Sequence, residues 1–413
     1  MSKEVISLGT STKPSPRGNS GRIWREVERN VARCDPNYLL LSNILPEGGD
    51  FDREFFALLV DGDHVGRASA AFNKNLEDVG FIEDFMVRED QKDFVDPLIE
   101  RCLSVLKDKG VKEVMVKGSS LPALQMEGYG EVPPYGCPNN PSWYVDLFER
   151  NGFLKTGEWT FFNLKLPEIS KDDARKFEET LDHLGIKLRP LKVRDPKDIM
   201  AFNDLMYETN AQPYMNINPM RDKKISRFSL FIGSMIMHFR KMKTFVGIDK
   251  NGEMVLFMGY FPDFNRAMVP LNAAWKRSLD PQEKGSVLSN LYHSLKVPFA
   301  IRRVRTCREL GVGLKVPTHS PSTNYSSSYS EACRDIGVGS AEGASGDIMI
   351  ADLLNYFIYL IKKDGYKEIT AGALISANVR MQDLSNFIGE YAGAIPAFRY
   401  ASFTYNFKDE EEA

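Results

Sequence analysis

A glycine-rich loop directly before an apolar helical run is the segment whose residue types come closest to a ligand-binding motif. It reads SAEGASGD, from Ser340 to Asp347, and the run IMIADLL follows it. Gly343 and Gly346 let the backbone approach a ligand closely, and the small side chains of Ala344 and Ser345 leave room. Backbone N–H groups at a helix start favour a bound phosphate. The segment predicts a phosphate cradle, although a flexible connection before a helix has the same composition.

An internal repeat gives this loop a place in a fold. With a shift of 255 residues, LIERCLSVLKDKGVKEV (Leu98 to Val114) aligns with LLNYFIYLIKKDGYKEI (Leu353 to Ile369). Each copy reads as an amphipathic helix that ends at a glycine and is followed by a strand. In both halves two hairpin strands and a third strand come before this helix, and a shorter helix and closing strands come after it. The order predicts an α/β fold in which a mixed sheet with helices on both faces occurs twice, although unrelated helices that end at glycine can look alike.

The same pattern divides the chain into two domains. Ser170 and Asp173 form an N-cap signature for a polar helix between the two halves. Strand four of the second half is expected at Ile301 to Leu314, so an insertion of about 25 to 30 residues separates it from the glycine-rich loop. The expected division is a flexible tail at 1–20, a domain at 21–168, a linker helix at 169–185, a domain at 186–407 with insertions near 264–297 and 313–338, and an acidic tail at 408–413.

Four motifs and the element order resemble the GNAT superfamily of acyl-CoA-dependent N-acyltransferases, in a tandem arrangement. The motifs are DPNYLLLSN (Asp35 to Asn43), VGRASAAFN (Val65 to Asn73), GYGEVPPYGCPNNPSWYVDLFERNGF (Gly128 to Phe153) and PDFNRAMVPLN (Pro262 to Asn272), and they look like one bacterial branch of two-domain GNAT-like proteins. The resemblance covers about residues 22–407. It implies that the fourth and fifth strands of each domain separate to receive the pantetheine arm, and that the loop after strand four binds the pyrophosphate.

The resemblance places very different sequences at the two pyrophosphate loops. The first half has VREDQKDF, Val87 to Phe94, which contains no glycine and three acidic residues, so this copy is expected to be degenerate. The second half has SAEGASGD, with Ser340 where the family usually has Gln or Arg and with Asp347 at the rim. We therefore expect acetyl-CoA or another acyl-CoA to bind the second domain through Gly343 to Gly346.

The resemblance also implies residues for the acyl transfer, in which an amine attacks the thioester and needs a base and a proton donor. Glu309, near the end of the expected strand four, is the candidate base, with an ordinary strand residue as the alternative. Asn378 matches an asparagine that many members place after strand five to contact the cofactor. Tyr391 is the candidate proton donor, but the usual position of that tyrosine holds Phe387, and a packing role is the alternative.

Composition narrows the classes of function. The chain has 53 basic and 56 acidic residues and a net charge of -3, which argues against DNA binding through bulk charge. Five cysteines without a CxxC pair and five histidines without ligand spacing predict a reduced cytoplasmic protein with no metal. Its apolar runs are shorter than the roughly 18 residues of a membrane span.

The leading hypothesis is an acyl-CoA-dependent N-acyltransferase, of the N-acetyltransferase kind, that acts on a small-molecule or peptide amine. One alternative is a Fem-like transferase that uses aminoacyl-tRNA. The other is a non-catalytic GNAT-fold binding or scaffold protein. A separation of strands four and five beside Gly343 would favour catalysis.

Overall fold

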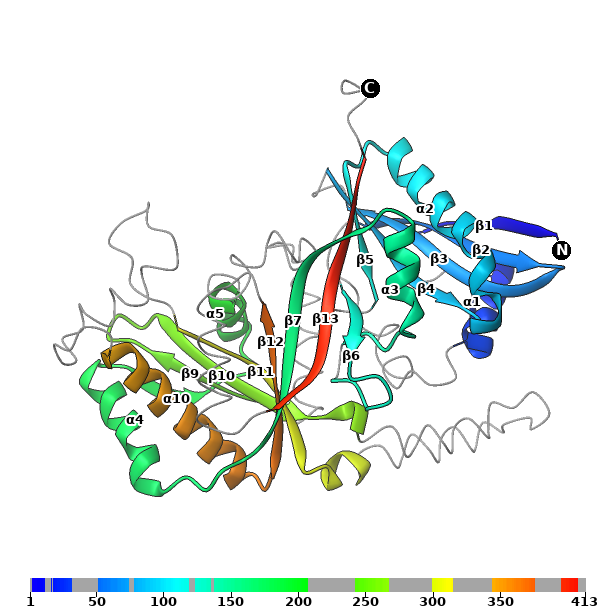
Figure 1. Ribbon diagram of the computed structural model, residues 1–413. Coiled ribbons are helices and arrows are strands. Elements are labelled where there is room, and N and C mark those ends of the chain that lie inside the picture. Colours follow the sequence, from blue (N-terminus) through cyan, green and yellow to red (C-terminus); the bar gives the residue numbers. More distant parts are fainter. Residues whose placement is uncertain are drawn as a thin grey trace.

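One mixed sheet runs through the molecule and carries all of the described strands (Figure 1). The computed structural model describes residues 2–11, 16, 18–31, 51–73, 78–118, 123–134, 137–206, 242–266, 299–314, 344–375 and 395–407. The strands are β1 (Lys3–Ser11), β2 (Phe51–Val60), β3 (Asp63–Asn73), β4 (Val79–Val87), β5 (Glu113–Lys117), β6 (Leu124–Glu127), β7 (Leu154–Lys165), β8 (Lys187–Pro190), β9 (Lys243–Ile248), β10 (Met254–Pro262), β11 (Thr306–Leu314), β12 (Glu368–Ile375) and β13 (Ile395–Asn406). The longer helices are α1 (Gly18–Val31), α2 (Asp96–Asp108), α3 (Trp143–Arg150), α4 (Lys171–His183), α5 (Pro196–Met206) and α10 (Ala344–Lys363), and η2 (Glu89–Phe94) is a 3-10 helix.

The order of the strands in the sheet is symmetric: each strand of the first half other than β6 has a counterpart at the same distance from the opposite edge. It runs β1-β2-β3-β4-β5-β13-β7-β12-β11-β10-β9-β8, with β6 paired to β13. The strands of the two halves therefore correspond in pairs, which are β1 with β8, β2 with β9, β3 with β10, β4 with β11, β5 with β12, and β7 with β13. This symmetry confirms the expected mixed α/β fold with two similar halves.

The two long helices end in the same way, which supports the repeat at the level of single hydrogen bonds. Gly110 after α2 and Gly365 after α10 have φ values of 79° and 86°. The N–H of Val111 donates to the carbonyl of Leu106 at 3.2 Å, and Tyr366 makes the corresponding bond in the second half at 3.4 Å. Only glycine adopts this left-handed conformation readily, so both helices stop where the sequence predicts.

The closing strands are exchanged between the halves. β7 follows α3 in the first half, yet it pairs with β12 of the second half. β13 is the last strand of the chain, and it pairs with β5 of the first half. The two strands also pair with each other, as Figure 1 shows at the centre of the molecule. Each half therefore borrows a strand from the other, and the sheet is continuous across them.

Helices cover both faces of the sheet. In the first half α2 and α3 pack on one face, and Trp24 of α1 packs against Phe55 on the other, with ring centroids 5.0 Å apart. In the second half α4 and α10 lie together on one face, and α5 covers the other. Successive residues of a strand face opposite sides, which is why Leu256 joins the α10 core and Phe257 joins the α5 core.

Two parts of the expected domain division need correction. The tail expected at 1–20 contains β1, which pairs along its length with β2 and completes the edge of the first half. The helix expected to be a linker, α4, is a core element: Phe177 packs against Tyr356 of α10, with ring centroids 5.3 Å apart. The N-cap at Ser170 is confirmed, since its hydroxyl accepts the N–H of Asp173 at 3.0 Å.

Candidate functional site

In the second half the parallel pairing of β11 and β12 stops after three residues. The pairs are Thr306 with Glu368, Cys307 with Ile369, and Arg308 with Thr370. Beyond them β11 continues beside β10, and β12 continues beside β7. A one-residue bulge in β11 between Glu309 and Gly311 follows directly. Among the described residues, the facing edges of β11 and β12 carry no ladder pairs after Arg308.

The first half has the same bulge in β4 but a different environment around it. β4 and β5 pair at five positions, which end at Glu83 with Lys117. The bulge follows at Asp84, whose φ is 53°, unusual for a residue other than glycine. A one-residue bulge thus occurs in both halves, in the strand before the long helix.

A buried ion-pair cluster lies at the end of the β4–β5 ladder. Glu83 accepts from Nε of Arg53 at 2.8 Å and from Nζ of Lys117 at 2.9 Å, and all three side chains are buried. Burial raises the pKa of Glu83, but the charges of Lys117 and Arg53 and their hydrogen bonds outweigh it and bring the pKa below 4.5. Glu83 is therefore a carboxylate held between two cations.

The start of α2 is occupied by side chains of the first half itself. Oδ1 of Asp96, in the first turn, accepts from Arg150 at 3.0 Å and from Asn151 at 2.9 Å. Before it, Arg88 and Asp90 form an ion pair at 2.5 Å, and hydrogen bonding from Arg88 lowers the pKa of Asp90 to about 2. One carboxylate lies in the first turn of α2 and the other in η2 just before it, so this segment does not favour another anion.

The start of α10 differs, because the helix begins within the glycine-rich segment. Ala344, Ser345 and Gly346 form its first turn. From Val79 to its partner Glu113 the first half spans 34 residues, and from Thr306 to Glu368 the second half spans 62, so the second half carries 28 more. The residues of the expected insertion, between strand four and the glycine-rich loop, lie outside the described part of the chain. Strand four was expected at Ile301 to Leu314; it ends at Leu314 as expected but starts only at Thr306, because residues 301–303 are helical.

The other predicted site residues are placed only in part. The backbone of Glu309 pairs with Tyr260 on β10, at the last position before the bulge. Gly343, Asn378 and Tyr391 lie outside the described residues. The structure therefore brings Glu309 to the end of the β11–β12 ladder and places Ala344 to Gly346 in a helix start.

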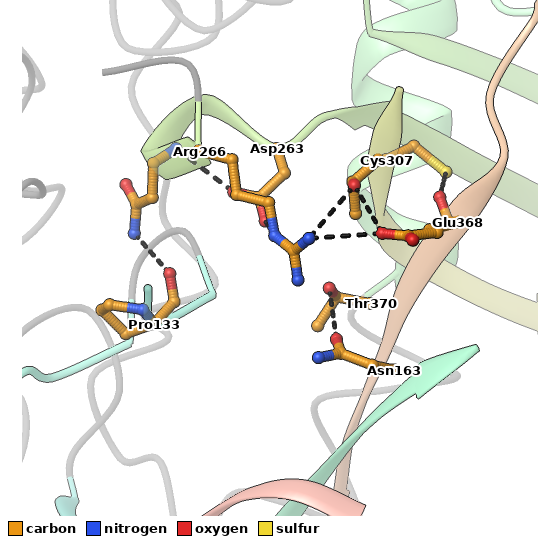
Figure 2. A network of polar contacts seen from close by, with 9 residues as sticks. Pro133, Asn163, Asp263, Arg266, Cys307, Glu368 and Thr370 are labelled. Atoms are coloured by element: carbon orange, nitrogen blue, oxygen red, sulfur yellow. Dashed lines mark hydrogen bonds and ion pairs between the residues drawn. The ribbon is translucent and has the colours of Figure 1, made fainter. Parts of the chain in front are cut away.

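A polar network joins the ends of β10, β11 and β12 (Figure 2). The guanidinium of Arg266 donates from Nη1 to Thr306 and Glu368, each at 3.3 Å, and its Nε lies 3.5 Å from Oδ2 of Asp263. Asp263 is buried, and burial raises its pKa, although Arg308 and Arg266 oppose the shift. These contacts fix the segment that follows β10.

The same segment contacts the first half. Nδ2 of Asn265 donates to the carbonyl of Pro133 at 2.8 Å. Nearby, Cys137 is buried beside Arg308 and Tyr400, and burial raises the pKa of its thiol. A thiol in this state is a poor nucleophile. The region between Arg308 and Cys137 is therefore built from both halves of the chain.

Sequence reasoning missed Glu83, Arg308 and Asp263. The sequence did contain a signal for Arg308. The predicted strand TCRELGVGL has few charged residues, and Arg308 is one of them. Glu83 lies in the apolar run VGFIEDFMV, and a carboxylate buried there needs a cationic partner. Its partners are distant in sequence, so no local pattern identifies them.

The described part of the chain contains no cluster of three or more His, Cys, Asp or Glu side chains arranged to hold a metal ion. Within the same part of the chain, no helix is long and apolar enough to cross a bilayer.

The fold is similar to that of a solved tandem GNAT protein. No family model matches the sequence, and no curated protein matches it. Among solved structures, a tandem GNAT protein from the clavulanic acid biosynthesis pathway has a TM-score of 0.50 at 8% identity, over 99% of this chain and 100% of that one. A probable N-acyltransferase from Enterococcus faecalis has a TM-score of 0.48 at 9% identity, over 98% and 72% of the two chains. N-myristoyltransferase from Saccharomyces cerevisiae with bound myristoyl-CoA has a TM-score of 0.41 at 9% identity, over 99% and 80%. With its symmetric sheet and two similar halves, the chain has the fold of a tandem GNAT protein.

Proposed function

We propose that the protein is an acyl-CoA-dependent N-acyltransferase that uses acetyl-CoA or another acyl-CoA and binds it in the second half. The observation that carries this proposal is the end of pairing between β11 and β12 after Arg308, on strands that flank α10. Unpaired strand edges offer backbone N–H and C=O groups. The two amides of a pantetheine arm can pair with such groups as an added strand does.

The pyrophosphate is assigned to the start of α10. The backbone N–H groups at Ala344 to Gly346 belong to the first turn and have no partner within a regular helix. The positive end of the helix dipole favours an anion there. In the first half the 255-residue shift places η2, with its carboxylate Asp90, at the matching position, which supports one cofactor per chain.

Titration calorimetry with acetyl-CoA tests this assignment. We expect one site per chain, and we expect Gly346→Asp to weaken binding at least about tenfold, because it adds a carboxylate at the helix start. Aspartate is a better helix former than glycine, so loss of binding would not reflect loss of the helix. Lys92→Asp, at an exposed position of η2 in the first half, is the control and should leave binding unchanged. Absence of binding, or equal weakening by both variants, would refute the proposal.

For the chemical step we propose Glu309 as the base that takes the proton of the attacking amine and Tyr391 as the proton donor to the thiolate. The position of Glu309 at the end of the ladder supports its role. Asn378 is proposed to contact the cofactor. Glu309→Gln should lower kcat about 100-fold or more without changing the Kd of acetyl-CoA. A variant with unchanged kcat would exclude this base.

A further inference from the structure

Arg308 occupies a special position in the sheet, because it is the last residue of β11 that pairs with β12. Its neighbour Cys307 packs in the core beneath α10. Since successive strand residues face opposite sides, Arg308 points to the face away from α10. There its guanidinium lies 5.2 Å from the centre of the Phe161 ring. The cofactor is proposed at the start of α10, on one face of the sheet. The opposite face, to which Arg308 points, is then available for the acceptor.

One donor of this guanidinium is unused. Within the described part of the chain, Nη1 of Arg308 is buried and has no hydrogen-bond partner. A guanidinium is always charged, and a buried donor without a partner is costly. The nearby carboxylate of Asp263 interacts with Arg308, but Arg266 shares it, and its oxygens also accept backbone N–H groups. Nη1 of Arg308 therefore has a hydrogen bond to offer to a further acceptor atom.

The side chains around Arg308 come from both halves. Cys137 precedes α3 in the first half, Phe161 lies on β7, and Tyr400 lies on β13. The rings of Phe161 and Tyr400 meet edge to face, with centroids 5.5 Å apart. A ligand at Arg308 would touch the exchanged strands and a loop of the first half. This gives the first half a role in binding even without a cofactor of its own.

We propose that Arg308 binds a carboxylate of the acceptor, so that the acceptor is an amine that also carries a carboxylate, such as an amino acid or a peptide with a free C-terminus. The inference rests on the proposed N-acyltransferase function. The carboxylate accepts from Nη1, which orients the amine toward the separated strands. The amine nitrogen then attacks the thioester carbonyl, the C–N bond forms as the C–S bond breaks, and the proton lost by the amine is balanced by the one gained by the CoA thiolate.

The test compares acceptors that differ only in the carboxylate. L-amino acids and short peptides are assayed beside their C-terminal carboxamides at saturating acetyl-CoA, and release of the CoA thiol is measured. We expect the wild-type protein to prefer the acids. In Arg308→Gln the KM for acids should rise about 10- to 100-fold while the KM for carboxamides stays constant, because a charge-assisted hydrogen bond is lost. Arg308→Lys should fall between the two.

Controls separate this inference from the proposed function. Arg303→Gln removes an exposed arginine close by and should change neither KM. Thermal unfolding and acetyl-CoA calorimetry on each variant show whether the fold and the cofactor site persist. Absence of acetyl-CoA binding by the wild-type protein overturns both proposals. Binding of acetyl-CoA without acylation of any carboxylate-bearing amine, equal use of acids and carboxamides, or an unchanged KM in Arg308→Gln overturns the carboxylate inference alone.

Discussion

Thr370 donates its hydroxyl to the side-chain oxygen of Asn163 at 2.9 Å, although 207 positions separate the two residues in the sequence. They face each other across the ladder between β12 and β7. The bond thus joins a strand of the second half to the closing strand of the first. β13, the closing strand of the second half, pairs in turn with β5 of the first half. Neither half therefore has a complete sheet of its own.

The exchange of strands predicts that the two halves unfold together. Thr370→Val removes the bond to Asn163 and should lower the free energy of unfolding by about 1 kcal/mol in one cooperative transition. Urea unfolding followed by both tryptophan fluorescence and far-UV circular dichroism should give coincident curves. Thr180→Val, on the exposed face of α4, is the control and should cost less. Two separate transitions would contradict this view of the sheet.

Close packing between β12 and β7 predicts that Gly372 tolerates no side chain. Its φ is 129°, and an added Cβ would lie 2.6 Å from the carbonyl oxygen of Thr160 and 3.0 Å from Cα of Phe161. Backbone cannot move aside cheaply, so Gly372→Ala should cost about 3 kcal/mol or more. Gly130→Ala is the matched control, because its φ is 89° but its Cβ would meet nothing within 4 Å, and it should cost about 1 kcal/mol. Equal costs in chemical unfolding would show that contact with β7 is unimportant.

Much of the fold could be predicted from local patterns. The amphipathic α2, the glycine at its end and the turn at Asp61 and Gly62 are encoded by residues near each other in sequence. The exchange of β7 and β13 could not be predicted this way, because alternation within a strand says which residues are buried but not which strand pairs beside it. β1 was missed for a related reason: KEVISLGTS alternates poorly and pairs as an edge strand.

The candidate site was less accessible to sequence reasoning. The glycine-rich segment before α10 and the position of strand four followed from the repeat, since a helix start and a strand end are local features. The surroundings of Arg308 depend on Cys137, Phe161 and Tyr400, which only the assembled sheet brings together. Long-range charge partners such as Arg53 and Lys117 around Glu83 are equally invisible in a single sequence.

The buried cluster around Glu83 predicts a specific sensitivity to acid. Glu83→Gln leaves Arg53 and Lys117 buried without their carboxylate and should cost about 3 to 5 kcal/mol at pH 7. The pKa of Glu83 is lowered in the folded state, so its contribution is present above pH 4.5 and is lost as the pH falls through the folded-state pKa.

Denaturant unfolding from pH 7 to pH 3 measures this dependence. The difference between the wild-type protein and Glu83→Gln should shrink as the solution becomes more acidic. Glu158→Gln, which breaks an exposed pair with Lys155, is the control and should cost at most about 0.5 kcal/mol. A constant difference across this range would mean that Glu83 is not held as a carboxylate.

Tyr260 predicts the opposite sensitivity, to alkali. Its hydroxyl lies 2.7 Å from Oδ2 of Asp364 and 3.2 Å from the carbonyl oxygen of Leu360, and burial, with the nearby Asp364 carboxylate, raises its pKa. A raised pKa means that the stabilisation is complete below the unfolded-state value of 10.0 and is lost as the pH rises above it. Tyr260→Phe should therefore cost about 1 to 2 kcal/mol at pH 7, and the cost should decline between pH 10 and pH 11.5 in urea unfolding. Tyr359→Phe removes a hydroxyl elsewhere on α10 and controls for the general effect of its loss. If the cost of Tyr260→Phe stays the same at every pH, the buried hydroxyl does not make the contribution that these distances indicate.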